Sequence, residues 1–445
     1  MSERYRKRAV PSVARSDHSA PVAAPPTGRR HLRLGYFVPE FPSQTHAFFW
    51  REAQAMKDAG AEIRFLSSRR PPDAACPHDF AAEARAATRY IYPPDVTGVM
   101  RLAARPRGLV AALSYVAALE ETRPAQKARL LGLIPCAADL AAVCAREGVD
   151  HVHFHSCADA AHIGAIANLL TGLPYSLTLH GDLPVYGVDH RAKMARAALI
   201  TAVTEPLAAQ IRDATGRSAE VIWMGVDTDR LRPAARLAGA AGPVHAVSIS
   251  RLNFVKGHRF FLAAMAQAVA EGLDLRYSIA GDGPHRDRLV AEIAQHGLGD
   301  RVELLGSIGQ DRVTTLLAEA DLFALTSVGQ GEAAPVAVME AMACGVPVVC
   351  SRIGGTPDMI TDDVDGLLVD QEDVAGIHRA VRRLILEEGL AQRLSRSARA
   401  RAERAFDHRV NAHKLLAAIA RSDRADEGRR SSTAPPKSTI EAAST

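Results

Sequence analysis

Two glutamates, Glu332 and Glu340, stand eight positions apart around the predicted start of a helix, where their side chains could do chemistry. A strand is predicted to end at Thr326, a glycine-bearing loop follows, and Pro335 suits the first turn of the helix. Free N–H groups at a helix start bind anions, and carboxylates accept hydrogen bonds from hydroxyl groups. The segment therefore indicates a site for a phosphate joined to a polyol, as in a sugar nucleotide. The plainer alternative is an exposed acidic loop followed by a surface glutamate.

The elements that must position these residues follow a repeating pattern. Short apolar strands alternate with helices over residues 32–223, and the alternation restarts at residue 244. This pattern predicts parallel sheets covered by helices on both faces. The chain has 445 residues, more than the ~250–300 at which a single hydrophobic core stops growing. We therefore predict an α/β fold with two doubly wound, Rossmann-like domains, whose ligands bind at the carboxyl ends of the strands.

The same pattern predicts where the domains begin and end. Within the first domain, residues 42–60 are predicted as a capped helix and residues 68–150 as mainly helical. The predicted parts are a disordered basic arm over 1–30, an N-terminal domain over 31–226, a linker over 227–243, a C-terminal domain over 244–403 and a disordered tail over 421–445.

The charge of the chain is unevenly distributed. The formal net charge is +4, and residues 1–30 hold seven basic against two acidic residues. The remainder is close to neutral and shows no basic stripe, which excludes nucleic acid as an expected partner. The arm is expected to be a solvated tail, and weak attachment to anionic lipid is the alternative.

The cysteines and the apolar runs bear on the cellular location. Six cysteines show no CxxC spacing and lie among apolar residues, which favours buried, reduced thiols. The N-terminus lacks the apolar core of a secretory signal. Residues 160–181 lack charged side chains, but Gly172 and Pro174 break the run, so it is not predicted to span a membrane. We expect a cytoplasmic protein, with peripheral contact at the inner face of the membrane as a further option.

Several motifs occur together in one order along the chain. Glu332, Glu340 and the following run Ala-Met-Ala-Cys-Gly-Val-Pro-Val-Val resemble the donor-binding signature of retaining GT-B glycosyltransferases of family 4, of the exopolysaccharide and colanic-acid type. The resemblance covers roughly residues 32–405. The supporting motifs are His-Gly-x-Asp in 179–182, the interdomain turn in 225–227, Arg-x4-Lys-Gly in 250–257 and Gly-Asp-Gly-Pro in 280–284.

The resemblance implies a fold, a reaction and a set of roles. It implies two Rossmann-like domains facing a central cleft, the N-terminal one completed by a final helix over 404–420. The reaction would move a hexosyl group from a UDP- or GDP-sugar to a saccharide or lipid-linked saccharide with retention, without a metal or a further cofactor. Arg251 and Lys256 would hold the diphosphate, Glu340 the ribose hydroxyls and Glu332 the donor sugar, while His180 would contact the sugar or the departing phosphate.

The implied residue sets are as follows. The catalytic set is Glu332, His180, Arg251 and Lys256. The acceptor-binding set is Ser43, Gln44, Thr45 and His46. The donor-binding set is Arg251, Lys256, Gly281, Glu332, Ala333, Ala334, Pro335, Val336 and Glu340.

Three positions depart from the family pattern. Ala333 replaces the usual glycine after the first glutamate, and Met224 replaces the usual asparagine before the interdomain turn. Gln44 stands where exopolysaccharide glycosyltransferases have an acidic residue. Ala333 is expected to narrow the access of the sugar to the backbone. Gln44 changes a position that the resemblance implies in acceptor binding, so the identity of the acceptor stays open.

Other functions and other motifs stay open as alternatives. A sugar-nucleotide 2-epimerase shares the two-domain plan, and a catalytically silent GT-B subunit could bind saccharide without turnover. Two Asp-x-Asp pairs match a metal pattern but fall in turns, so structural roles are favoured. Three alternating histidines could likewise bind a metal, but the sequence shows no carboxylate or cysteine partner. These decoys are Asp227 with Asp229, Asp363 with Asp365, and His151 with His153 and His155.

Overall fold

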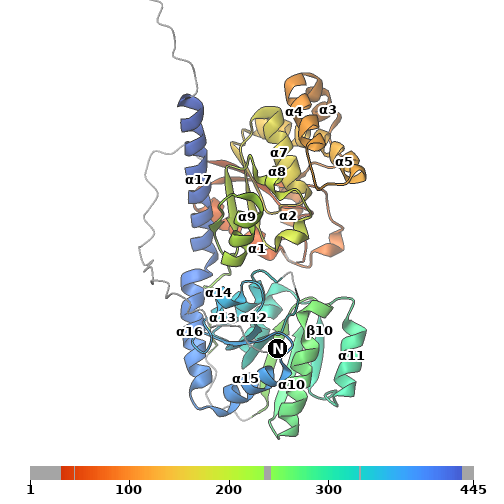
Figure 1. Cartoon of the computed structure of the whole chain (residues 1–445). Helices are drawn as coiled ribbons and strands as arrows, with labels where there is room; N and C mark the ends of the chain where they lie inside the picture. The colour runs from red at the N-terminus through yellow and green to blue at the C-terminus, as the bar shows by residue number, and fades with distance from the viewer. Residues whose placement is uncertain (1–31, 45, 235–241, 330–331, 433–445) are drawn as a thin grey trace, which may run out of the picture. The chain divides into compact units, whose positions relative to one another are not determined.

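A computed structural model describes residues 32–44, 46–234, 242–329 and 332–432. The predicted arm over 1–30, Thr45 and part of the predicted linker therefore lie outside the described residues. Two sheets are present, one of seven strands and one of six, and every strand pair within them is parallel. The α/β prediction of two Rossmann-like domains is confirmed (Figure 1).

The first sheet has the strand order β3-β2-β1-β4-β5-β6-β7. The chain starts in the middle, runs outward to β3 and then returns to pair β4 with β1, so the strand order reverses between β1 and β4. Ligands of doubly wound sheets bind at such a point, beyond the carboxyl ends of the strands. The strands are β1 (Arg33–Phe37), β2 (Glu62–Ser67), β3 (Thr88–Tyr90), β4 (His151–Phe154), β5 (Tyr175–Leu179), β6 (Leu199–Ala202) and β7 (Glu220–Val221).

Helices cover both faces of this sheet because each has an apolar side. Gly164 in the helix α7 (Asp159–Thr171) lies where an added Cβ would press on the rings of Phe154 and Tyr175, so a small residue lets helix and sheet approach. Residues 124–147 are apolar and long enough to cross a membrane, but most of this stretch is buried and many of its side chains belong to the core. The helices are α1 (Ala47–Asp58), η1 (Asp73–Ala75), α2 (Ala81–Ala87), α3 (Val96–Ala103), α4 (Pro106–Ala117), α5 (Pro124–Leu131), α6 (Leu133–Glu147), α7 (Asp159–Thr171), η2 (Leu183–Tyr186), α8 (His190–Met194) and α9 (Glu205–Thr215).

The second sheet has the order β10-β9-β8-β11-β12-β13 and reverses between β8 and β11. Its strands are β8 (Val244–Ile249), β9 (Leu275–Ala280), β10 (Val302–Gly306), β11 (Leu322–Leu325), β12 (Val348–Ser351) and β13 (Leu367–Val369). Its helices are η3 (Phe254–Lys256), α10 (His258–Ala270), α11 (Arg286–Gln295), α12 (Gln310–Ala318), α13 (Val336–Ala343), α14 (Thr356–Met359), α15 (Val374–Leu386) and α16 (Leu390–Ala405).

The last helix, α17 (His408–Ser432), packs along α1 of the first half (Figure 1). It begins at His408, later than the predicted 404, because Asp407 interrupts the helix and accepts the N–H groups of Arg409 and Val410. The turn is closed by Thr228, whose hydroxyl donates to Asp407 (2.5 Å). The helix also continues through residues 421–432, which were predicted as a disordered tail, since alanine, arginine and acidic residues there favour helix. The rest of that tail lies outside the described residues.

Two further predictions in the first half need correction. The helix predicted over 42–60 begins only at Ala47, because Phe41 donates its N–H to Ser67 Oγ and Ser43 accepts the N–H of His46, which holds the preceding residues in a loop. The region 68–150 is mainly helical, as predicted, but it also contains β3. Three residues are too few to show a strand pattern in the sequence.

Candidate active site

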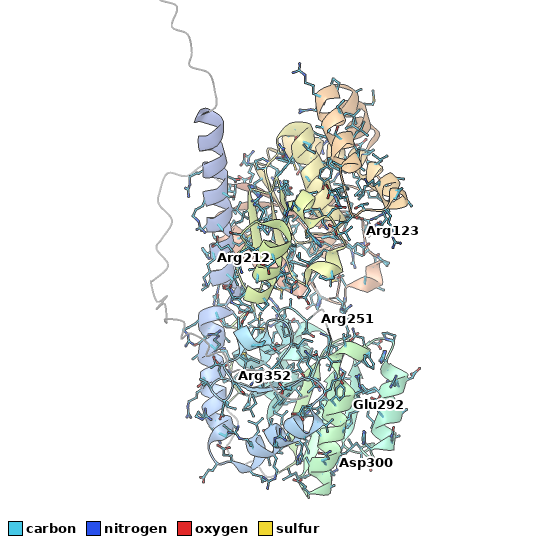
Figure 2. All side chains as sticks on the ribbon, in the orientation of Figure 1. Arg123, Arg212, Arg251, Glu292, Asp300 and Arg352 are labelled. Carbon is cyan, nitrogen blue, oxygen red and sulfur yellow. The ribbon has the colours of Figure 1, made fainter. Side chains whose placement is uncertain are left out.

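A cavity of about 350 Å³ opens where β8, β9 and β11 end. Arg251, Lys256, Glu332 and Glu340 all line it, together with residues of α1 and its preceding loop. The structure thus brings together the two cations and the two carboxylates that lie up to 89 positions apart in the sequence. Arg251, labelled in Figure 2, is exposed and follows the end of β8 by two residues.

Glycine shapes the loop that carries the cations. Gly257 has a φ of +65°, and a Cβ there would overlap the carbonyl oxygen of Thr326. Gly281 has a φ of +139°, and a Cβ there would overlap the carbonyl oxygen of Ser250. Both glycines therefore let neighbouring strand ends meet closely, which an L side chain would prevent. This contact places Arg251 and Lys256 over the strand ends.

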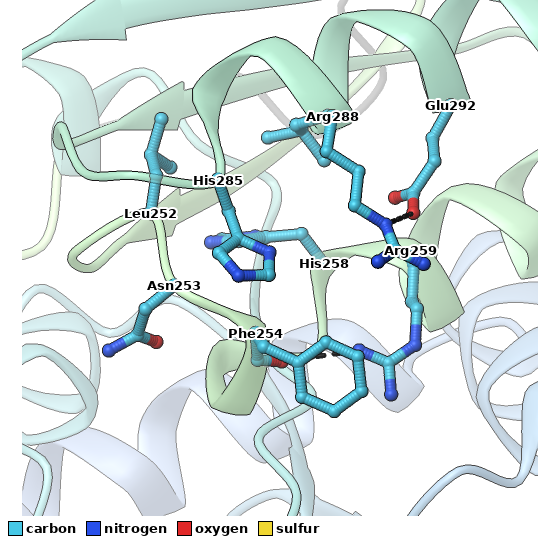
Figure 3. Close-up of a pocket in the computed structure, with 9 residues that line it drawn as sticks. Leu252, Asn253, Phe254, His258, Arg259, His285, Arg288 and Glu292 are labelled. Atoms are coloured by element: carbon cyan, nitrogen blue, oxygen red, sulfur yellow. Dashed lines mark hydrogen bonds and ion pairs between the residues drawn. The ribbon is translucent and has the colours of Figure 1, made fainter.

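The short helix η3, which ends at Lys256, is held in place by a side chain of α10. The guanidinium of Arg259 lies 3.7 Å from the ring centre of Phe254 and donates to the Phe254 carbonyl oxygen (3.2 Å). Figure 3 shows this stack beside the ring of His285 and the ion pair of Arg288 with Glu292. The last residue of this helix, Lys256, lines the cavity.

Lys256 forms an ion pair with Glu332, and Ser327 Oγ donates a hydrogen bond to the same carboxylate oxygen of Glu332 (2.9 Å). The side chains of Lys256 and Glu332 are only 15% and 11% exposed. The partner of Lys256 thus stands 76 positions away along the chain.

Glu340 is also held by neighbours from two elements. Gln310 Nε2 donates to Glu340 Oε1 (3.2 Å), and Arg51 of α1 lies 3.5 Å from the same oxygen. The helix α13 places Glu340 in its second turn, and Pro335 is the N-cap residue, one position before the predicted first turn. Both carboxylates of the cavity are therefore paired with a cation.

His180 lies beside this group and does not line the cavity. It follows β5 directly, and its Nε2 is 3.2 Å from His155 Nδ1. The ring of Phe48, which does line the cavity, packs on His180 with centroids 5.4 Å apart. Burial, with a contribution from His46, lowers the pKa of His180 to about 3, so its ring is neutral at physiological pH.

The predicted acceptor residues are divided by the structure. Gln44 lines the cavity, donates through Nε2 to Ser307 Oγ (3.0 Å) and has its carbonyl oxygen 2.7 Å from His78 Nε2. Ser43 and His46 do not line it, and the ring of His46 instead packs on two phenylalanines. Burial, with a smaller contribution from His78, lowers the pKa of His46 to about 4.

The donor residues predicted around the helix start mostly reach the cavity. Gly281, Ala334, Pro335 and Val336 line it, whereas Ala333 is buried beneath and its carbonyl oxygen accepts the N–H of Gly355. Sequence reasoning missed several lining residues that belong to no motif. Phe48 and Arg51 lie on the predicted helix 42–60 and Ile308 and Gln310 follow a predicted strand, whereas His78 had no such signal.

The decoy residues have structural partners. The Asp227 carboxylate accepts the N–H groups of Asp229 and Arg230, and Asp363 pairs with two arginines. The rings of His151 and His153 are hydrogen-bonded to hydroxyl groups of β5. Within the described ranges, no group of three His, Cys, Asp or Glu side chains has an arrangement that could hold a metal ion.

Comparison with known proteins gives matches over both halves. A family model described as "Glycosyltransferase Family 4" matches residues 45–230, and one described as "Glycosyl transferases group 1" matches residues 237–401. The chain is 27% identical over 371 residues to the "Putative colanic acid biosynthesis glycosyltransferase WcaL" of Escherichia coli, covering 78% of this chain and 89% of that protein.

Two further matches extend this likeness. The chain is 30% identical over 260 residues to the "GDP-mannose-dependent alpha-(1-6)-phosphatidylinositol monomannoside mannosyltransferase" of Mycolicibacterium smegmatis, covering 54% of this chain and 68% of that protein. The crystal structure of Alr3699/HepE of Anabaena in complex with UDP shares the fold, with a TM-score of 0.68, 18% identity and coverage of 87% of this chain and 100% of that chain. The chain therefore belongs to glycosyltransferase family 4 and is a glycosyltransferase with the GT-B fold.

Proposed function

We propose that the protein moves a hexosyl group from a nucleotide-diphosphate sugar to a saccharide or lipid-linked saccharide, with retention of configuration, in exopolysaccharide or cell-surface polysaccharide synthesis. The name of the WcaL relative supports the polysaccharide, and the UDP in the HepE structure supports a nucleotide-sugar donor. UDP- and GDP-sugars are both candidate donors. We infer that it works in the cytoplasm, in reach of an acceptor at the inner face of the membrane.

One observation carries the proposal: a single cavity holds two buried carboxylates and three cations, Arg51, Arg251 and Lys256. A diphosphate supplies the negative charge that Arg251 and Lys256 can bind, and ribose and hexose supply the hydroxyl groups that carboxylates accept. A nucleotide sugar carries all of these groups in one molecule. When it binds, its diphosphate replaces Glu332 as the partner of Lys256 and frees Glu332 for a sugar hydroxyl.

The same cations serve the bond-breaking step. Negative charge grows on the leaving phosphate as the sugar departs, and fixed positive groups stabilise that charge without reorganising. We propose that Arg251 and Lys256 supply this stabilisation in place of a metal ion. Because Lys256 and Glu332 are largely buried, the interaction acts where water screens it little.

The test compares Glu332→Gln with wild type. Nucleotide release from UDP- and GDP-sugars is measured with a polysaccharide extract as acceptor, and nucleotide binding is measured by calorimetry. We expect transfer to fall more than tenfold while nucleotide affinity is kept or rises, because Glu332 acts on the sugar and its carboxylate competes with the diphosphate for Lys256. The matched control Glu387→Gln removes an exposed carboxylate of an ion pair at the end of α15 and should leave both values unchanged.

The outcomes separate the alternatives. Unchanged turnover in Glu332→Gln contradicts the role of this carboxylate. Release of free nucleotide and an isomerised sugar without any acceptor identifies an epimerase. Binding of nucleotide without release under any donor and acceptor identifies a silent subunit.

A further inference from the structure

A second cavity, of about 240 Å³, opens at the carboxyl ends of four neighbouring strands of the first sheet. The strands are β3, β2, β1 and β4, so this cavity lies where the strand order reverses between β1 and β4. Ligands of doubly wound sheets bind at such a point, and we refer to it as the switch-point cavity. Six side chains with hydroxyl or charged groups line it: Glu40, Ser68, Arg69, Tyr92, Ser156 and Asp159.

The switch-point cavity and the candidate active site are lined by the same two connecting segments. In the loop between β1 and α1, Glu40 lines the switch-point cavity and Gln44 lines the candidate active site. Between β2 and α2, Arg69 lines the first and His78 lines the second. No described residue lines both. A chain molecule held in the candidate active site therefore has a second place to bind along the same two segments.

The charged groups of the switch-point cavity are balanced. Glu40 Oε1 lies 3.7 Å from Arg69 Nε, and Asp159 accepts hydrogen bonds from both terminal nitrogens of Arg129 (2.5 Å and 2.9 Å). Each carboxylate thus has a cation, and its oxygens can accept further hydrogen bonds. An ionic ligand would have to displace one member of a pair. The arrangement therefore favours an uncharged ligand that carries hydroxyl groups.

An exposed tyrosine and a buried serine suit the same kind of ligand. Tyr92 is 56% exposed, and an aromatic ring offers a flat apolar surface to the C–H face of a sugar ring. Ser156 is buried, and its Oγ accepts the N–H of Ala158 and can still donate a hydrogen bond. An alkyl chain in this cavity would cover charged and hydroxyl groups without bonding them, which is unfavourable. A saccharide satisfies both the ring and the polar groups.

Glu40 has a backbone conformation that glutamate seldom adopts. Its φ is +52°, in the left-handed region, where glycine carries no steric penalty. Its ion pair with Arg69 is 60% and 64% exposed, and exposed pairs of this kind stabilise a protein little. The pair therefore does not account for a glutamate at a strained position. Strain of this kind is characteristic of functional sites, which indicates a role in binding a ligand.

We propose that the switch-point cavity binds a second sugar unit of the acceptor saccharide, next to the unit that receives the hexosyl group. Tyr92 packs on the ring of this second unit, and Glu40 and Asp159 accept hydrogen bonds from its hydroxyl groups. The volume of about 240 Å³ lies below the ~300–1,000 Å³ of sites for drug-sized ligands, which suits a single sugar ring. The inference rests on the proposed function, because it assumes a saccharide acceptor. None of these three residues belongs to the acceptor-binding set that the sequence resemblance implies.

The test measures how KM for the acceptor depends on acceptor length. Nucleotide release from UDP- and GDP-sugars is followed with single sugars, disaccharides and tetrasaccharides, separated from a partial acid hydrolysate of the surface polysaccharide of the producing cells. In wild type, KM should fall about threefold or more from the single sugars to the longer fractions, because only these fractions reach the switch-point cavity.

Two variants remove the proposed contacts. Tyr92→Ala and Glu40→Gly should each raise KM for the longer fractions about three- to tenfold, the worth of one such contact, and leave kcat and KM for single sugars unchanged. Glycine suits the positive φ at position 40, so Glu40→Gly should unfold at the same urea concentration as wild type, which separates a lost contact from a damaged loop. The matched controls keep the wild-type length dependence: Leu386→Ala, an exposed apolar residue of α15, and Glu372→Gly, at a φ of +64° in the second half of the chain.

A second readout does not need turnover. Saturation-transfer NMR with the tetrasaccharide fraction and no nucleotide sugar should give a signal in wild type and in the controls, reduced about threefold or more in Tyr92→Ala and Glu40→Gly. Equal KM values for single sugars and longer fractions, or no saccharide signal in wild type, overturn the inference even where sugar transfer occurs. Absence of nucleotide release with every fraction, together with a signal that Tyr92→Ala reduces, overturns the proposed function and leaves the saccharide site standing.

Discussion

The ion pair of Lys256 with Glu332 allows a quantitative test of how the cavity binds its donor. Two unit charges about 4 Å apart attract by about 1 kcal/mol in water and about 4 kcal/mol at an effective dielectric constant of 20. Both side chains are largely buried, which places the pair above the water limit. We therefore expect a coupling free energy between about 1 and about 4 kcal/mol in the absence of nucleotide.

The assay is a double-mutant cycle of Lys256→Met, Glu332→Gln and the double variant. Urea unfolding gives the free energy of unfolding of each protein, and the coupling is the departure from additivity. The cycle is repeated with saturating UDP or GDP, whichever binds. The coupling should then fall, because the diphosphate takes the place of Glu332 beside Lys256.

A second cycle at Arg383 and Glu387 serves as the control. This pair is 40% and 49% exposed, so its coupling should stay below about 1 kcal/mol with or without nucleotide. Additivity at Lys256 and Glu332 within about 0.5 kcal/mol would refute the description of the pair as an energetic unit. A coupling that nucleotide leaves unchanged would refute the exchange of partners.

Two further predictions concern the second half of the chain. Gly257→Ala places a Cβ against the carbonyl oxygen of Thr326 at a positive φ, so it should displace Lys256. Nucleotide affinity measured by calorimetry should fall at least tenfold, and the free energy of unfolding should also decrease. Gly272→Ala, at a positive φ with open space around it, is the control and should change only the free energy of unfolding. Burial, together with Lys256, lowers the pKa of His258 from 6.5 to about 4, so the folded state keeps this ring neutral; its stabilising contribution is complete above pH 6.5 and is lost as the pH falls toward 4. His258→Gln should flatten the urea-unfolding profile over that range, by about 3 kcal/mol at most, and an unchanged slope would contradict this.

The parts of the site that the sequence could predict are those built from neighbouring residues. The helix start before Glu340 was visible because a strand end, a glycine-bearing loop and Pro335 follow one another along the chain. The same local logic placed Arg251 after β8. The prediction of two doubly wound domains needed only the alternation of short apolar strands and helices, which is also local.

The partners of these residues could not be predicted, because they come from other elements. Glu332 reaches Lys256 across 76 positions, and Arg51 reaches Glu340 from the first half of the chain. The alternating histidines were recognised as one face of a strand, but the carboxylate beside His155 belongs to α1 and had no signal in the pattern. Packing of separate elements decides such contacts, and no spacing in the sequence encodes them.

The pairing of each carboxylate with a cation has a consequence for selectivity. Free phosphate can replace Glu332 beside Lys256, but it leaves a buried carboxylate without a compensating group, which is unfavourable. A neutral sugar can offer hydroxyl groups to Glu332 or Glu340, but it then leaves Lys256 or Arg51 without an anion. A molecule with both a diphosphate and hydroxyl groups gives every separated side chain a new partner, because the diphosphate binds the cations and the hydroxyl groups bind the carboxylates. The proposed function therefore implies that the cavity favours a nucleotide sugar over its separate parts through the exchange of partners and not through any one contact.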